Sequence, residues 1–177
     1  MEEFEKNCIF CNIGLHLIPS NIIYEDDDIL AFLDVNPATY GHTLIIPKKH
    51  YDNFLCCPKE VMHKIMDLAQ RIGQVSIKEL GAKGVNILTN CGEAAGQSVK
   101  HFHVHVIPRY EAKEGFQITM KGNLKDLNLP SLAIQIKQDL KNNWILKTLQ
   151  INQAFFRKLK PFIIEWFFLY LFKYIIY

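Results

Sequence analysis

The chain has 177 residues, of which 49% are hydrophobic and 21% charged, and its formal net charge is +2. This length suits one domain, or one domain with an appendage, and is sufficient to bury a core without disulfide bridges. Proteins that bind nucleic acids usually show a clustered basic face, so the small net charge disfavours a nucleic-acid partner and favours a small-molecule substrate.

Cysteine usage and the first residues bear on the compartment. Five cysteines, an odd number, do not resemble a disulfide framework and indicate a reducing environment. The first ten residues, MEEFEKNCIF, carry acids where a secretory signal carries basic residues, and they lack an apolar segment of signal length. We therefore expect a cytoplasmic protein.

Residues 21–50 alternate short apolar runs with acidic, Asn-Pro and Tyr-Gly breaks. This pattern is typical of successive antiparallel strands joined by turns. It predicts strands at Ile22–Tyr24, Ile29–Asp34 and Thr43–Pro47.

A helix is predicted after these strands, beginning at Pro58. Proline suits the first turn of a helix, and Gly81 and Gly84 suit its end. Between them, apolar residues recur every three or four positions and give the helix one apolar face; these are Val61, Ile65, Leu68, Ile72 and Val75.

Two further strands are predicted to complete the sheet. GVNILTN, at 84–90, is typical of a fourth strand and HFHVHVI, at 101–107, of a fifth, with a Gly- and Ala-rich loop over 91–100 between them. Because side chains alternate between the two faces of a strand, the three histidines of the fifth strand should share one face. Ser131–Leu140 is predicted to be a short helix.

Residues 143–177 differ in composition from the rest. They hold five basic residues and one acidic residue, a net +4, so that residues 1–142 carry −2. Their apolar end, at 161–177, is shorter than the roughly 18 to 20 residues of a spanning helix, and Glu165 and Lys173 interrupt it. We expect a helix packed on the domain or in an oligomer interface, with a membrane-surface contact as the second alternative and a transmembrane span as the third.

Cys8 and Cys11 have the C-x-x-C spacing that brings two thiolates to one metal ion. His50 and His101 are the candidates for the other two ligands of a tetrahedral zinc site. Four protein ligands leave no position for water, so such a site would be structural and would fasten the N-terminal segment to the sheet. A thioredoxin-like redox pair, or two unrelated thiols, is the alternative.

Two kinds of chemistry fit the alternating residues His101, His103 and His105. They could together hold a catalytic zinc ion with an open position for an activated water. One imidazole could instead attack phosphorus directly, because neutral imidazole is abundant at pH 7 when its pKa is about 6.5. Three histidines in register beside a Gly-rich loop disfavour a purely structural role.

The loop before the histidines, NCGEAAGQSVKH, is typical of a phosphate site. Gly92 and Gly96 allow a tight turn whose amides face a ligand. Asn90, Gln97 and Ser98 add neutral donors, which suit a phosphate that gains negative charge during a reaction.

Four segments together resemble the histidine triad (HIT) superfamily in order and spacing. They are CIFC, AFLDVNP, GHTLIIPKKH and GQSVKHFHVHVIPR, between about Cys8 and Tyr110. The resemblance is strongest to bacterial members of the purine nucleoside phosphoramidase branch, with the dinucleoside polyphosphate hydrolases next. It implies an α+β fold, with a five-stranded antiparallel sheet and two main helices, that pairs into the ten-stranded sheet of a homodimer. Residues 1–142 would form the HIT domain and 143–177 an extension of unknown role.

The resemblance also implies a nucleotidyl hydrolase that acts on purine nucleotide conjugates, mainly of adenosine, through a covalent nucleotidyl-histidine intermediate. It assigns the nucleophile to His103 and supporting catalytic roles to His105, His42 and Ser98. The implied nucleotide-binding residues are Asp34 at the ribose, Val35 at the base, and Asn90, Gly96, Gln97 and Ser98 at the phosphate or leaving group.

In the zinc-bearing members of the family, Cys8, Cys11, His50 and His101 match the four ligands. The resemblance thus gives His101 to a structural zinc that the chemical step does not require. A nucleotide-binding interaction module with little turnover, whose tail recruits a partner or a membrane, stays open as an alternative.

Overall fold

The structure, a computed structural model, describes residues 4–112, 115, 117, 122 and 128–156. The chain divides into two compact units, residues 1–119 and residues 120–177. The first unit contains the sheet and both candidate sites, and the described residues of the second unit include one long helix.

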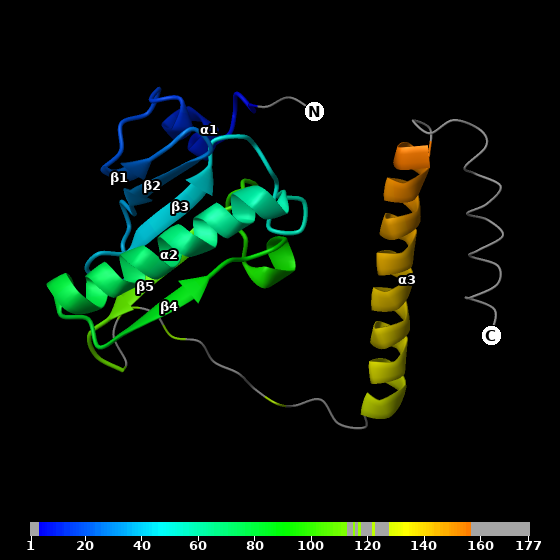
Figure 1. The fold of residues 1–177 in the computed structure, drawn as a ribbon. Helices are drawn as coiled ribbons and strands as arrows, with labels where there is room; N and C mark the ends of the chain where they lie inside the picture. Colours follow the sequence, from blue (N-terminus) through cyan, green and yellow to red (C-terminus); the bar gives the residue numbers. More distant parts are fainter. Residues whose placement is uncertain (1–3, 113–114, 116, 118–121, 123–127, 157–177) are drawn as a thin grey trace. The chain divides into compact units, whose positions relative to one another are not determined.

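Five strands form one antiparallel sheet in the order β1-β2-β3-β5-β4 (Figure 1). This confirms the predicted α+β class and the predicted number of strands. β3 has the predicted bounds, whereas β1 and β2 differ from prediction by one residue and β4 ends two residues early. The strands are β1 Ile22–Glu25, β2 Ile29–Leu33, β3 Thr43–Pro47, β4 Gly84–Leu88 and β5 Val104–Arg109.

β5 begins at Val104, so the predicted strand start at His101 was wrong. The backbone just before β5 bends instead, and the N–H of Phe102 donates to the carbonyl oxygen of Tyr51 at 2.6 Å. Only His105 of the three histidines therefore lies in regular strand.

The predicted alternation of faces extends beyond the end of the strand. Phe102, Val104 and Val106 belong to one core cluster. The rings of His103 and His105 lie 4.9 Å apart on the other side of the chain. His103 and His105 thus share a surface, although only His105 belongs to the strand ladder.

Helix α2, Lys59–Leu80, lies across the sheet (Figure 1). Its apolar face packs on side chains of the central strands, which alternate between the two faces of the sheet. Pro58 precedes the helix, and Gly81 follows it with φ 73°, a left-handed conformation that glycine adopts without strain. This core holds Ile29, Ala31, Ile45, Ile65, Leu68, Ala69, Phe102, Val104 and Val106.

A second core lies on the opposite side chains of the same strands and includes α1, Ile9–Gly14, which was not predicted. Phe10 and Ile13 of α1 are buried there together with Leu30 and Phe32 of β2. Both faces of β2 and β3 are thus covered, which explains why every residue of β3 is buried.

The second unit contains α3, Leu129–Phe156, which includes the predicted Ser131–Leu140 helix and extends well beyond it. The predicted division between residues 142 and 143 falls inside α3, and as a statement about domains it stays a prediction. Within the described residues, no helix is both long and apolar enough to cross a membrane. The apolar stretch 161–177 lies outside the described residues, so its packing or membrane contact stays a prediction.

Candidate active site and metal centre

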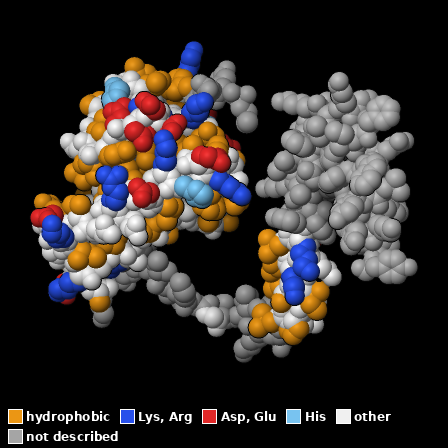
Figure 2. All heavy atoms as spheres, viewed as in Figure 1, with side chains coloured by type: hydrophobic (Ala, Val, Ile, Leu, Met, Phe, Trp, Pro, Cys, Tyr) orange, Lys and Arg blue, Asp and Glu red, His pale blue; other side chains and the backbone are white. Residues whose placement is uncertain are grey.

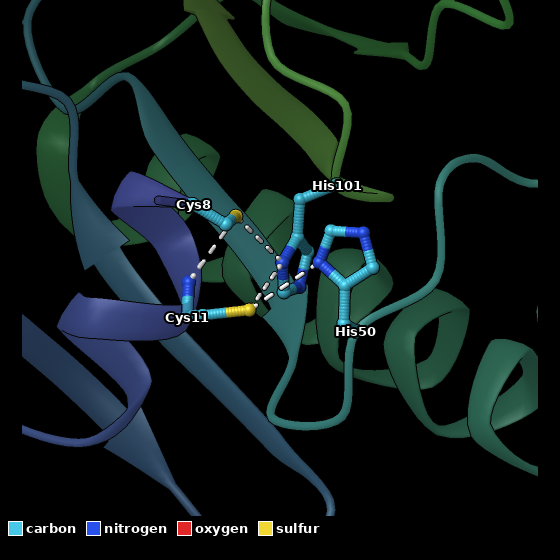
Figure 3. A group of neighbouring side chains, drawn as sticks. All are labelled: Cys8, Cys11, His50 and His101. Atoms are coloured by element: carbon cyan, nitrogen blue, oxygen red, sulfur yellow. Dashed lines mark hydrogen bonds between the residues drawn. The ribbon is translucent and has the colours of Figure 1, made fainter. Parts of the chain in front are cut away.

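Cys8, Cys11, His50 and His101 converge from three parts of the chain (Figure 3). Cys8 caps the N-terminus of α1 (Ile9–Gly14) and Cys11 lies within it, whereas His50 follows β3 and His101 precedes β5. Their four possible ligand atoms all lie within 4.8 Å of one another. The Nδ1 of His101 is 3.3 Å from Cys8 Sγ and 3.5 Å from Cys11 Sγ, and the Nδ1 of His50 is 3.3 Å from Cys11 Sγ.

These separations fit a tetrahedral metal site. With bonds of about 2.3 Å to sulfur and about 2.0 to 2.1 Å to nitrogen, sulfur and nitrogen ligands of zinc lie roughly 3.6 Å apart. Burial raises the pKa of the Cys11 thiol to about 11. The thiol would therefore be protonated at neutral pH without a metal, and metal binding would release its proton.

The hydrogen bonds of Nε2 in His50 and His101 determine the protonation of Nδ1, the nitrogen that faces the cysteines. His101 Nε2 lies 2.9 Å from the carbonyl oxygen of Pro47, which can only accept, so Nε2 carries the proton and Nδ1 keeps its lone pair. His50 Nε2 is held in the same way by the carboxylates of Glu5 at 3.1 Å and Asp52 at 3.2 Å. Such partners are typical of histidines that bind metal.

His103 has its proton assigned by the backbone. Its Nδ1 lies 2.7 Å from the carbonyl oxygen of His101, so Nδ1 donates and the lone pair is on Nε2. Burial lowers the pKa of His103, against the smaller opposing effects of this hydrogen bond and of Asp34. A neutral imidazole with a lone pair on Nε2 is the form that can act as a nucleophile.

His42 and His105 form a second directed pair. The N–H of Ala38 donates to His42 Nδ1 at 3.1 Å, so His42 carries its proton on Nε2 and donates it to His105 Nδ1 at 3.0 Å. His105 therefore carries its own proton on Nε2. Asp34 Oδ2 lies 3.6 Å from His42 Nδ1, too far for a hydrogen bond but near enough to act by charge.

A cleft of about 440 Å³ opens beside these histidines. His103 and His105 lie on its wall with Ser98 and Asp34, and most of the other lining side chains are apolar. The volume is that of a small-ligand site with a few polar groups at one side. The other lining residues are Ile9, Phe10, Ile13, Ile18, Pro19, Ser20, Phe32, Val35, Asn36, Leu44 and Val99.

A sequence model of the HIT domain matches residues 16–112, more than half of the chain. The chain belongs to the HIT-domain family. It is 42% identical over 130 residues to an uncharacterised HIT-like protein of Methanocaldococcus jannaschii, which covers 73% of this chain and 98% of the relative. It is 40% identical over 107 residues to adenylylsulfatase HINT3 of Arabidopsis thaliana, which covers 60% of this chain and 54% of that protein.

Solved HIT proteins share the fold. A HIT family protein from Bacillus anthracis matches with a TM-score of 0.70 at 39% identity, over 76% of this chain and 97% of that one. A zinc-bound histidine triad family protein from Mycobacterium smegmatis matches with a TM-score of 0.59 at 37% identity, over 66% of this chain and 84% of that one.

The HIT domain brings most of the predicted site residues together, but not all. Asp34, Val35, Ser98, His103 and His105 line the cleft, with Val35 78% exposed at its mouth. His42 lies behind His105. Asn90, Gly96 and Gln97 do not line the cleft, and their contact with a phosphate stays a prediction.

Phe10 is a member of the site that the sequence interpretation missed. Its ring packs edge-on against the rings of His103 and His101, with ring centroids 5.1 Å and 5.9 Å apart, respectively. It therefore contacts one histidine of the candidate metal centre and one histidine of the cleft. The signal in the sequence was its place between Cys8 and Cys11, because residues between two ligands of one metal ion must also lie near that ion.

The HIT domain should lose stability in acid partly through His105. Burial, with smaller effects of His103 and His42, lowers the pKa of His105 from 6.5 to about 4. Between these values the unfolded chain binds a proton that the folded chain does not, so stability falls as the pH falls from 6.5 toward 4. His105→Gln should therefore lose less stability between pH 7 and pH 5 than the wild type, measured by urea unfolding.

The matched control is His63→Gln, because His63 lies exposed on α2. This variant should keep the pH dependence of the wild type. An unchanged pH dependence in His105→Gln would show that His105 accepts a proton in the folded protein as easily as in the unfolded chain.

Proposed function

We propose that the protein is a nucleotidyl hydrolase that cleaves adenosine 5′-phosphoramidates or related AMP conjugates through a nucleotidyl-His103 intermediate. The observation that carries the proposal is the hydrogen bond of 2.7 Å from His103 Nδ1 to the carbonyl oxygen of His101. Because Nδ1 carries the proton, the lone pair of His103 is on Nε2, and His103 itself lies on the wall of the cleft. Neutral imidazole in a cleft is suited to attack at phosphorus.

In the proposed reaction, His103 Nε2 attacks the α-phosphorus, a nitrogen–phosphorus bond forms and the bond to the leaving group breaks. Water then cleaves the new bond and releases AMP. The Nε2–H of His105, oriented by His42, would donate to the phosphoryl oxygens where negative charge develops. Ser98, on the same wall, would hydrogen-bond the phosphate or the leaving group.

The nucleoside would occupy the rest of the cleft. Asp34 can accept hydrogen bonds from both ribose hydroxyls, and its Oδ1 already accepts the N–H of Asn36 at 2.9 Å, which fixes the carboxylate. Val35 and the apolar wall would cover a purine base. The proposal keeps this purine preference and makes no assignment of the leaving group.

The alternative in which the three histidines hold a catalytic zinc has less support. The groups of described residues whose ligand atoms converge are Cys8-Cys11-His50-His101 and Asp34-His42-His105, and neither contains His103. In the second group, His42 and His105 face each other because they share a hydrogen bond. A lone pair used in that bond is not available to a metal.

The test of the function is a panel of adenylated compounds, measured together with the zinc content of the purified protein. The panel comprises an adenosine 5′-phosphoramidate, adenosine 5′-phosphosulfate, an aminoacyl adenylate and a dinucleoside polyphosphate. We expect the phosphoramidate to give the highest kcat/KM. Preference for the polyphosphate would assign the protein to the other hydrolase branch, and AMP binding with no turnover of any compound would favour an interaction module.

We also propose that Cys8, Cys11, His50 and His101 hold a structural zinc ion. The mixed thiolate and imidazole donor set is the one that zinc prefers, and four protein ligands close the site to water. Bound zinc would fasten α1 to the sheet. Because the two thiols must be reduced to bind metal, the proposal includes the cytoplasmic location.

A homodimer with a ten-stranded sheet is part of the proposal, and β4 is its best supported contact. β1 and β4 are the edge strands, and the register of β1 is irregular between Ile22 and Tyr24, which makes it a poor template for a second copy. β4 is regular along five pairs with β5 and exposes Ile87 by 44%. Figure 2 shows acidic and basic side chains intermingled on the visible face of the sheet-containing unit. The proposal includes no nucleic-acid partner, because proteins that bind nucleic acids usually show a clustered basic face.

Ile87→Lys should therefore weaken the dimer. A charged side chain on an edge strand opposes strand pairing, so we expect the dissociation constant to rise by about tenfold or more, since 1.4 kcal/mol is a factor of ten. Sedimentation velocity over a range of concentrations measures it. Ile23→Lys, on the other edge and 48% exposed, is the control and should associate as the wild type does; the reverse pattern would place the contact at β1.

A further inference from the structure

The side-chain amide of Gln97 is fully engaged inside the protein. Its Nε2 donates to the carbonyl oxygens of Asp52 at 2.6 Å and Val99 at 2.9 Å, and its Oε1 accepts the N–H of Gly92 at 2.7 Å. The residue is 8% exposed. Since an amide has two N–H donors, a phosphate contact through Nε2 would require one of these hydrogen bonds to break.

Gln97 holds the loop of residues 91–98 closed. The bond from Gly92 joins the two ends of the loop, and the backbone N–H of Gln97 also donates to the carbonyl oxygen of Gly92 at 3.1 Å. The next residue, Ser98, lines the cleft with His103. The position of Ser98 on the cleft wall therefore depends on how Gln97 is held.

Asp52 links this loop to the metal centre. Its carbonyl oxygen accepts from Gln97, while its carboxylate lies 3.2 Å from His50 Nε2, the nitrogen opposite the one that faces Cys11. The neighbouring Tyr51 carbonyl accepts the N–H of Phe102, directly after His101. His50 and the residue after His101 are thus hydrogen-bonded to residues 51–52, the segment to which Gln97 also donates.

We propose that Gln97 is a positioning residue that couples the Cys8-Cys11-His50-His101 centre to the 91–98 loop, so that zinc and nucleotide each tighten the binding of the other. The proposal rests on the function proposed above, because it takes this loop to hold the phosphate side of the substrate. Coupling between two ligands is reciprocal, so the factor by which zinc tightens AMP binding equals the factor by which AMP tightens zinc binding.

The test is Gln97→Glu in the full chain. Glutamate has the same shape, but it places a carboxylate oxygen against the carbonyls of Asp52 and Val99, and this repulsion should displace the side chain from the Gly92 N–H. The zinc dissociation constant is measured by competition with a chelator, with and without saturating AMP. We expect AMP to tighten zinc binding by about fivefold or more in the wild type, the lower end of usual coupling, and by no measurable factor in Gln97→Glu.

Hydrogen exchange of the loop gives a second readout that needs no nucleotide. Removal of zinc should speed exchange at the Gly92 amide in the wild type, whereas in Gln97→Glu exchange should be fast with or without zinc. Gln70→Glu, at an exposed position of α2, is the control and should keep both wild-type responses. Wild-type coupling in Gln97→Glu, or a wild-type loop that ignores zinc removal, would overturn the proposal.

Asp52→Ala guards against a misfolded Gln97 variant. The Asp52 side chain is 68% exposed, so its removal should not unfold the protein, and its carbonyl still accepts from Gln97. We expect the AMP–zinc coupling to fall while the loop stays protected; full coupling in this variant would also overturn the proposal. Turnover by the wild type tests the proposed hydrolase activity separately. Coupling without turnover would reject only the hydrolase activity, and turnover without coupling would reject only the proposed role of Gln97.

Discussion

Replacement of His103 by alanine is expected to lower turnover of an adenosine 5′-phosphoramidate by about four orders of magnitude or more, as the loss of a nucleophile does in other enzymes. One zinc ion per chain should stay bound in this variant. The reason is geometric, because the four residues of the proposed zinc site converge without His103. The measurements are kcat/KM and the metal content of the same preparation.

The controls separate chemistry from packing. His63→Ala removes an exposed imidazole on α2 and should leave turnover unchanged. His103→Gln keeps more of the volume beside Phe10 and should be as inactive as the alanine variant. Loss of zinc together with activity in both His103 variants would instead favour the zinc-hydrolase alternative.

Cys11→Ser is expected to release the zinc ion and to lower the free energy of unfolding substantially. A ligand present at a thousand times its dissociation constant stabilises the folded state by about 4 kcal/mol, and this variant should lose most of that contribution. Cys11 is 1% exposed in the core that holds α1, so the loss should also expose α1 to proteolysis. Urea unfolding with and without a chelator measures the effect.

Chelation should destabilise the wild type and have little further effect on Cys11→Ser. Cys56→Ser is the matched control, since Cys56 is exposed and its Sγ donates to the carbonyl oxygen of Asn53, as a serine hydroxyl can. A Cys11→Ser variant that binds zinc as tightly as the wild type would reject the assignment of the site.

Sequence periodicity predicted the elements that carry a clear repeat. β3 was correct at both ends because its apolar residues follow soon after the Tyr-Gly break and end at Pro47, before two lysines. Helix α1 was missed because its six residues are too few to show a period of 3.6. β5 was placed too early because the alternation of side chains continues through residues 101–103, where the backbone has already left the ladder.

The site was predictable in membership but not in detail. Cys8 and His101 are 93 positions apart. The C-x-x-C spacing made His101 a candidate ligand beside the cysteines, and the family resemblance then gave the same assignment. No pattern in the sequence shows which nitrogen of His103 carries the proton, because a backbone carbonyl decides it. Gln97 is a similar case, since a glutamine beside a glycine can face a ligand or the protein with the same neighbours in sequence.

The most direct test of the central claim is to mix the protein with labelled adenosine phosphoramidate, quench within milliseconds, and map the label by mass spectrometry under conditions that preserve nitrogen–phosphorus bonds. We predict an AMP adduct on the peptide that contains residues 101–109, located on His103, and its absence from His103→Gln. Turnover that continues without any adduct on His103, and that stops on chelation, would contradict the proposed mechanism.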